Sequence, residues 1–414
     1  GYAKLGYDFT DNWKVWGDVN VTRFNATNPG SVMKPYIDND QRITRGMTSF
    51  ALENYYEKTS GALSFFYNWG DHWINDGYQP GGEPLQYRFN SNDQMLGVSW
   101  YQRVQLFQGN RLTVGADYFH FGGEAWNQFF DGHRETSANK SLNEVAGYVD
   151  FRQDIAAWLT LDAGARVDYH SQTGTEFIPQ VGLAFHLPEN AEIKAMASKG
   201  FRNPTIREMY MFPPQNPDLK PEKLWNYEIG MKYFSSDYKF NLNAALFYID
   251  WEDQQIFVMG MMGPGIKNAG DAHSLGGEMD LRWEFLPNLT YILSAGYSHA
   301  EYYHNLDKSH EGNRIVMAPE FTGNTGFIYQ KAVKTSCFRS FVASTTVTGF
   351  GTQYFDEANL LKQKPYFLWN LDLSISGKYA DFRIWGKNIL DKAFFTYMLN
   401  NPVGQKLPIY NDMG

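Results

Sequence analysis

"WLTLDAGARVDYH", residues 158–170, alternates between apolar and polar side chains from Leu159 onward. Successive side chains of a β-strand point to opposite sides, so this alternation sorts the residues onto two faces. One face carries Leu159, Leu161, Ala163, Ala165, Val167 and Tyr169, and the other carries Thr160, Asp162, Gly164, Arg166 and Asp168. The stretch therefore predicts a strand with one apolar face.

The same alternation recurs along the chain, for example in residues 60–69 and 368–379. In water the apolar face would pack on a second sheet, whereas in a transmembrane barrel it faces lipid and the polar face lines the lumen. The connections between strands favour the barrel, because short and long connections alternate. The short ones are 10–12, 187–190, 235–237, 286–288 and 380–381, and the long ones are 25–45, 70–88, 122–141, 201–222, 255–271, 303–318 and 351–366. We predict an all-β, transmembrane, antiparallel up-and-down β-barrel of about eighteen strands.

Composition agrees with a barrel. Aromatic residues make up 17% of the 414 residues, yet the mean hydropathy is -0.47, so the aromatics lie within polar sequence. Tyr, Trp and Phe also cluster near the ends of the expected strands, as interfacial girdles require. The single cysteine, Cys337, excludes a disulfide framework. The net charge of -9 disfavours nucleic acid as a partner.

One irregular stretch carries a resemblance to a known family. "GFRNPTIREMYMFPPQNPDLKPE", residues 200–222, has five prolines and no alternation. Its Gly-Phe-Arg-x-Pro and Asn-Pro-x-Leu-x-Pro-Glu boxes resemble those of TonB-dependent outer-membrane receptors, in which they bracket an extracellular loop. Residues 267–281, 318–329 and 382–395 resemble later strands of that family, in the same order.

The resemblance implies a larger architecture than an eighteen-stranded sheet. The family fold is a 22-stranded barrel with an N-terminal plug in the lumen. By this comparison residues 1–414 would be a partial receptor barrel, without the plug, the first strands and the last strand. The same comparison places the protein in the outer membrane of a Gram-negative bacterium, as a multi-pass β-barrel.

Two groups of methionines lie in consecutive expected long loops. Met209 and Met211 flank Tyr210, and a second group occupies "VMGMMGPG" at 258–265. Consecutive long loops of an antiparallel barrel are neighbours, so the groups could converge over the pore mouth. The candidate ligand-binding residues are Met209, Tyr210, Met211, Phe212, Phe257, Met259, Met261, Met262 and Arg202.

Three interpretations of these methionines are open. Thioethers could bind a copper ion. With the neighbouring aromatics they could form an apolar vestibule for a bulky ligand. Alternatively, they could simply pack the loops together. Arg202 would turn into the lumen, where it could pair with carboxylates or meet an anionic ligand.

Signals for catalysis and for metal binding are few. The sequence has no nucleophile elbow, no phosphate-binding glycine loop and no His-Glu-x-x-His motif, so we predict neither an enzyme nor a resident cofactor. His304 and His310 are weak metal-site candidates, because they share one expected loop with Asp307 and Glu311.

The sequence therefore predicts an active outer-membrane transporter. Its preferred substrate is a ferric siderophore, with haem, cobalamin or copper as alternatives within the family and a passive porin or an outer-membrane hydrolase as alternatives outside it. The expected partners are the TonB energy-transducing complex, acting through the plug, a metal-chelate small molecule, and the bilayer with its lipopolysaccharide. The resemblance also allows for a surface lipoprotein over the loops.

Overall fold

A computed structural model describes residues 1–31, 34–211, 215–260, 263–333, 335, 337–400 and 406–409. An eighteen-stranded antiparallel sheet dominates it. Its strands are β1 (Tyr2–Thr10), β2 (Trp13–Ala26), β5 (Asp40–Tyr55), β6 (Thr59–Asn75), β7 (Tyr87–Val104), β8 (Asn110–Phe129), β9 (Arg134–Ala156), β10 (Leu159–His170), β11 (Gly174–Leu187), β12 (Ala191–Arg202), β13 (Glu222–Phe234), β14 (Phe240–Gly260), β15 (Gly263–Leu286), β16 (Leu289–Asn305), β17 (Phe321–Ala332), β18 (Phe338–Phe350), β21 (Tyr366–Gly377) and β22 (Asp381–Gly386).

Small elements lie in the connections between these strands. They are the two-residue strands β3 (Gly30–Ser31), β4 (Lys34–Pro35), β19 (Gln353–Tyr354) and β20 (Lys362–Gln363), and the turns η1 (Arg207–Met211) and η2 (Lys308–His310). The pair β23 (Tyr397–Asn400) and β24 (Lys406–Ile409) follows the last strand of the sheet. No helix among the described residues is long and apolar enough to cross a membrane.

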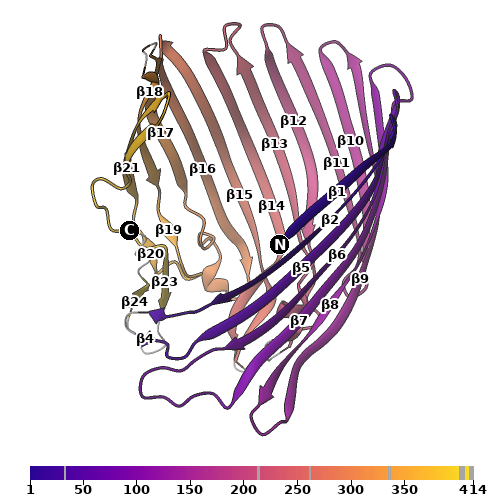
Figure 1. Ribbon diagram of the computed structural model, residues 1–414, viewed down its shortest axis with the longest axis vertical. Helices are drawn as coiled ribbons and strands as arrows, with labels where there is room; N and C mark the ends of the chain where they lie inside the picture. Colours follow the sequence, from indigo (N-terminus) through magenta and orange to yellow (C-terminus); the bar gives the residue numbers. More distant parts are fainter. Residues whose placement is uncertain are drawn as a thin grey trace.

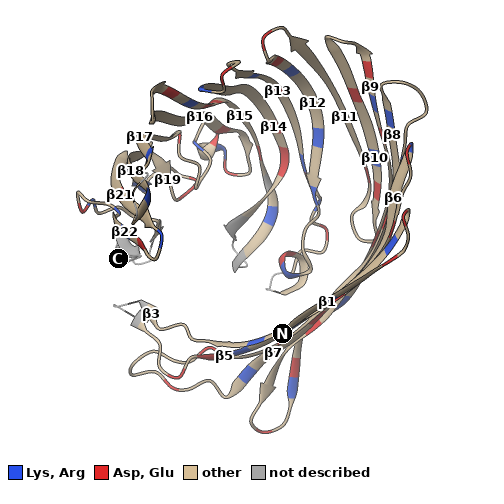
Figure 2. Cartoon of the chain, turned by 45° about the horizontal axis from the view of Figure 1, so that its top comes forward, with Lys and Arg blue, Asp and Glu red and all other residues tan. Residues whose placement is uncertain are grey.

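Each strand of the sheet pairs with the next one along the chain, which makes an up-and-down meander. The sheet curls into a ring, and among the described residues no ladder joins β1 to β22 (Figure 2). Short turns lie on one rim, at the top of Figure 1, and long connections lie on the other. The predicted fold class and the approximate number of strands are confirmed.

Two expected long loops are largely strand. Residues 122–141 belong mostly to β8 and β9, which a short turn joins, and the described residues of 255–271 belong to β14 and β15. These hairpins extend beyond the apolar band, where neither of their faces meets lipid. Hydropathy therefore stops alternating while the backbone ladder continues, and the loop prediction was wrong there.

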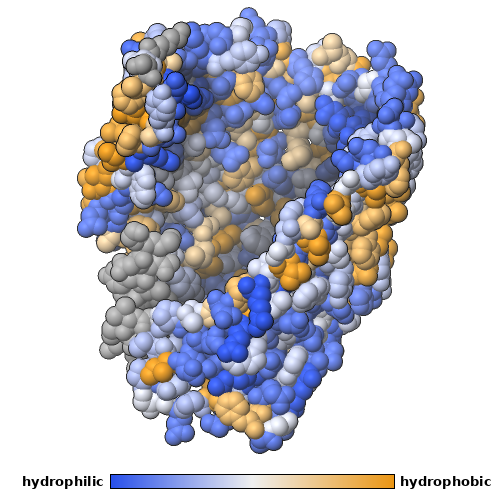
Figure 3. All heavy atoms as spheres, viewed as in Figure 1, coloured by the Kyte–Doolittle hydropathy of each residue, from blue (hydrophilic) through white to orange (hydrophobic). Residues whose placement is uncertain are grey.

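The two faces of the wall differ in chemistry, as the alternation on β10 predicts. Val167 and Tyr169 are about half exposed on the outside, whereas Asp168 and His170 are buried on the inside. Inside the ring, Arg166 forms ion pairs with Asp117 of β8 and with Asp168. Figure 3 shows that the long-loop half is mostly hydrophilic and that apolar residues gather on the wall above it.

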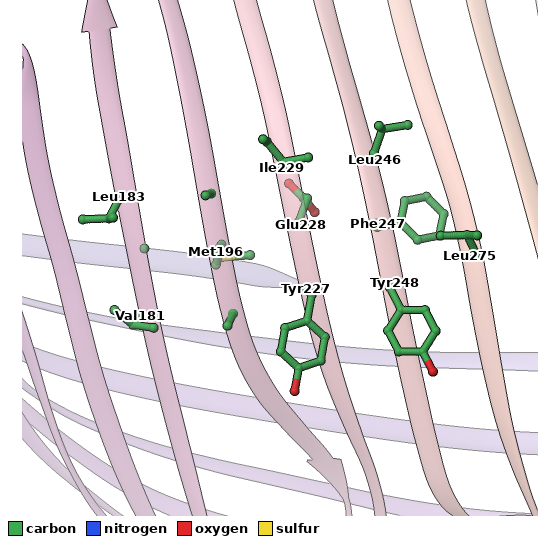
Figure 4. A pocket seen from close by; sticks show the side chains of 13 residues that line it. Val181, Leu183, Met196, Tyr227, Glu228, Ile229, Leu246, Phe247, Tyr248 and Leu275 are labelled. Carbon is green, nitrogen blue, oxygen red and sulfur yellow. The ribbon is translucent and has the colours of Figure 1, made fainter.

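A shallow depression of about 550 Å³ on the outer wall spans β11 to β15 (Figure 4). Exposed apolar side chains surround it, among them Val181, Tyr227, Ile229, Leu246 and Leu275. Because these side chains belong to the apolar outer face, the depression is a lipid-facing surface and does not open into the lumen.

Candidate functional site

Residues 203–211 and 215–221, in the connection between β12 and β13, lie inside the ring and form the candidate site (Figure 2). We call this connection the inner loop. The prolines favour an irregular loop here, since they fix φ and cannot donate to a ladder. Thr205 and Glu208 begin the turn η1: the Thr205 hydroxyl accepts from the Glu208 amide at 3.2 Å, and Glu208 accepts from the Thr205 amide at 2.7 Å. This reciprocal pair is a capping box.

Apolar residues of η1 pack against β9. Met209 is fully buried and Tyr210 is 6% exposed, in a cluster with Leu219 of the same loop and Ala138 and Leu142 of β9. Phe121, Ile206, Met211 and Ile266 pack against this cluster. The ammonium of Lys140, also on β9, lies 4.5 Å from the centre of the Tyr210 ring.

The unequal lengths of β9 and β10 explain this contact. β10 pairs with β9 only as far as His170, which lies opposite Glu144. The segment of β9 from 134 to 143 has β8 on one side and lacks a β10 partner on the other. The inner loop packs on this segment.

Arg202 ties the start of the inner loop to its end. Its guanidinium binds both carboxylate oxygens of Glu222, each at 3.1 Å, and contacts Glu208 at 3.0 Å. It also donates to the side-chain oxygen of Gln255 at 2.7 Å. Glu222 is 7% exposed, so Arg202 supplies the counter-charge that a buried carboxylate needs. Pairing with carboxylates is what the structure shows for Arg202.

The same ion pairs set the charge of Glu208. Burial alone would raise its pKa. Hydrogen bonds from Thr205 and the nearby Arg202 outweigh burial and hold the pKa below the usual value of 4.5. Glu208 is therefore a carboxylate at neutral pH, bound to the loop and to Arg202 together.

The inner loop also contacts the β14–β15 hairpin, as expected for consecutive long loops. The Asn216 side chain donates to the carbonyl of Ile266 at 3.0 Å, and the amide of Lys220 donates to Asn268 at 2.9 Å. Whether the two methionine groups converge stays a prediction. Phe212, Met261 and Met262 lie outside the described residues, and nothing is described of the side chains of Phe257 and Met259.

His304 and His310 lie apart from the inner loop, and each faces a different carboxylate. His304 lies 3.3 Å from Asp271, and His310 lies 3.5 Å from Glu357 of the next connection. In the part of the chain that the structure describes, no group of three or more His, Cys, Asp or Glu residues is arranged to hold a metal ion.

The β9 side of the site does not follow from the sequence prediction, which places Ala138, Lys140 and Leu142 in a loop and at its edge. Ala138 and Leu142 lie on the same face of β9, but Lys140 between them interrupts the apolar pattern in "SANKSLNEV" at 137–145. Since Lys140 and Leu142 precede the inner loop by more than sixty residues, only the register of the sheet places them beside η1.

Comparison with known proteins supports the same architecture. The family model "TonB dependent receptor-like, beta-barrel" matches residues 1–389. The chain belongs to this receptor family. It is therefore an outer-membrane β-barrel of a Gram-negative bacterium.

Curated relatives of this receptor barrel match over part of their length. The pesticin receptor of Yersinia pestis is 23% identical over 236 residues, which cover 56% of this chain and 33% of that receptor. The vitamin B12 transporter BtuB of Photobacterium profundum is 26% identical over 135 residues, covering 32% of this chain and 21% of the transporter. The match thus spans a third or less of these relatives.

Solved receptors share the fold at low sequence identity. The ferric yersiniabactin uptake receptor of Yersinia pestis superposes with a TM-score of 0.74 at 16% identity, over 97% of this chain and 67% of that one. A variant of the ferric enterobactin receptor of Pseudomonas aeruginosa gives 0.78 at 15% identity, over 98% and 66%.

Proposed function

We propose that this barrel belongs to an active transporter that captures a metal chelate, most simply a ferric siderophore, at its long-loop rim for import into the periplasm. The observation that carries the proposal is the inner loop. Its described residues lie inside the ring and attach to β9 and to the β14–β15 hairpin. Several relatives are described as receptors for siderophores, which supports this substrate class.

The ligand step that fits this geometry is an exchange at Arg202. Its side chain is 45% exposed, so a ligand can reach it. An anionic chelate would replace Glu208 on the guanidinium while Glu222 keeps its bidentate contact. Tyr210 and the methionines would supply apolar contacts once the loop shifts, because Met209 and Tyr210 are buried at present. The same shift would loosen η1 from β9.

We further propose that import depends on TonB acting through a plug within the ring. A surface lipoprotein over the loops is a second proposed partner. Neither requires a catalytic group, and we propose that the protein is not an enzyme.

The test is growth of a deletion strain on defined sources of iron, haem, cobalamin or copper. The expected result is loss of growth on one ferric chelate, restored by the wild-type gene and not by one carrying Arg202→Ala. Tyr238→Ala is the matched control, since Tyr238 is 75% exposed in the turn between β13 and β14 and lies outside the site. Cobalamin is the second candidate, because a vitamin B12 transporter is among the relatives.

Two results would refute the transporter. Steady, large conductance of the full-length protein in a planar bilayer would identify a porin. Hydrolysis of lipid or peptide by the purified protein, abolished by replacing one histidine near the long-loop rim, would identify an enzyme.

A further inference from the structure

A polar cavity lies at the opposite end of the wall from the inner loop, on the short-turn rim. It has a volume of about 460 Å³ and is formed by the turn after β5, the ends of β7 and β9 and the start of β8. Four cationic side chains line it, Lys58, Arg103, Arg111 and Arg152, against the two acidic residues Glu57 and Asp154. The lining therefore carries a net positive charge.

The three arginines share the inner face of the wall. Arg152 lies opposite Asp162 of β10, on the same face as Arg166 and Asp168. Arg111 lies directly opposite Arg152 in the β8–β9 ladder. Arg103 of β7 lies opposite Thr113, two residues from Arg111 and on the same face of β8.

A directly opposed pair of like charges is unfavourable without a counter-ion. Side chains opposite each other in an antiparallel pair have Cβ atoms about 5 Å apart, and diagonal neighbours are about 7–8 Å apart. Within the described residues, none of the three guanidinium groups donates a hydrogen bond or lies within ion-pair distance of a carboxylate. Other inward arginines differ: Arg166 and Arg202 each bind two carboxylates.

Carboxylates lie near the arginines without forming ion pairs with them. Asp154 accepts a hydrogen bond from the hydroxyl of Thr160 at 2.8 Å. Asp162, which adjoins a second carboxylate, Asp150, interacts electrostatically with Arg152 and Arg111, but no carboxylate of the described residues lies within ion-pair distance of either guanidinium. Each guanidinium presents a planar fork of donors that suits carboxylate and phosphate oxygens.

We propose that this cavity is a binding site for a small polyanion that carries two or more carboxylate or phosphate groups. The spacing of Arg103, Arg111 and Arg152 over adjacent strands matches separate anionic groups of one molecule. A transport role rests on the proposed function: tight turns mark the periplasmic rim of such barrels, so the cavity would hold an anionic chelate on its way out.

The experiment is titration of the purified full-length protein in detergent with citrate and, separately, pyrophosphate, at constant ionic strength. We expect saturable binding of at least one of them. Arg111→Gln/Arg152→Gln should weaken it at least tenfold, whereas Arg282→Gln should leave it unchanged. Arg282 is a fair control, because it is an exposed arginine near the same rim, on β15.

Thermal unfolding provides the second readout. Without polyanion the double variant should melt no lower than wild type, since the like-charge pair is gone. Added polyanion should raise the melting temperature of wild type and of Arg282→Gln only, because a ligand stabilises the state it binds.

Two outcomes would overturn the inference: no saturable binding to wild type, or equal binding by the double variant. If neither citrate nor pyrophosphate binds, and the Arg111→Glu/Arg152→Glu receptor also misassembles, the arginine cluster is assigned to a protein contact instead. These results are independent of the growth test. Loss of the siderophore assignment would leave anion binding intact, and the reverse also holds.

Discussion

Replacing Met209 by alanine should release the inner loop from β9 while leaving the barrel folded. The Met209 side chain is fully buried among Ala138, Leu142, Tyr210 and Leu219. Truncating a buried methionine to alanine costs about 2–5 kcal/mol, from lost transfer free energy and the remaining cavity. At about 1.4 kcal/mol per factor of ten, this corresponds to a rise of about 30-fold to several thousand-fold in the open population of the loop.

Hydrogen exchange read by mass spectrometry measures that population directly. Amides of residues 205–211 should exchange faster in Met209→Ala by the same factor, because their exchange requires local opening. Amides of β10 should be unaffected. Met317→Ala is the matched control, since Met317 is a 47% exposed methionine in the connection after β16. If residues 205–211 exchange within twofold of the wild-type rate, Met209 does not hold the loop and the reasoning fails.

Three further predictions concern the ion pairs of the loops. Arg202→Ala should lower the free energy of opening the inner loop by about 1–3 kcal/mol, because Glu222 loses a charged hydrogen-bond partner. A double-mutant cycle with Glu208→Ala should show coupling between the two side chains, and additive effects would contradict their contact. The pKa of Glu208 is lowered, so the inner loop should stay attached to the wall above pH 4.5 and detach as the pH falls through the lowered pKa. A spin label at Asp218→Cys, in a Cys337→Ser background, should become mobile over that pH range. The same label should show no such pH dependence when Glu208→Gln is added. Burial raises the pKa of Glu357 although His310 opposes the shift, so the charged carboxylate destabilises the fold as the pH rises. Glu357→Gln should therefore slow amide hydrogen exchange of residues 351–363 at pH 8 and leave it unchanged at pH 4. Equal effects at both pH values would refute this.

Much of the membrane-spanning fold could be predicted from the sequence, because there the environment imposes the pattern. On β10 one face meets lipid and the other meets the lumen, so Val167 and Asp168 differ in polarity as they differ in surroundings. Beyond the bilayer this constraint ends. Residues 134–143 are strand by backbone pairing, yet the sequence predicts mostly a loop there, because no lipid-facing side imposes an apolar alternation and only Ala138 and Leu142 are buried.

The candidate site was predictable in part, for a related reason. Sequence boxes located the inner loop, and for Arg202 they left pairing with carboxylates and contact with an anionic ligand both open. They could not show that Met209 would be buried against Leu142, because that contact depends on where β10 ends relative to β9. Contacts set by strand length are a property of the whole sheet, and no local pattern encodes them.

The unequal strands also bear on how the protein is assembled in the membrane. At about 3.3 Å per residue and a tilt near 40°, the 12 residues of β10 rise about 30 Å, which suffices for an apolar band about 25 Å tall. The 23 residues of β9 rise about 58 Å by the same geometry, so roughly half of that strand stands outside the bilayer.

The outer part of β9 has β8, which pairs in turn with β7, on one side and the inner loop on the other. The membrane-spanning part of the wall has complete strand pairing on both sides of β9, and the inner loop replaces β10 only beyond it. We therefore expect substitutions in the inner loop to be tolerated during insertion, which would let this surface vary between receptors that share one membrane-embedded wall.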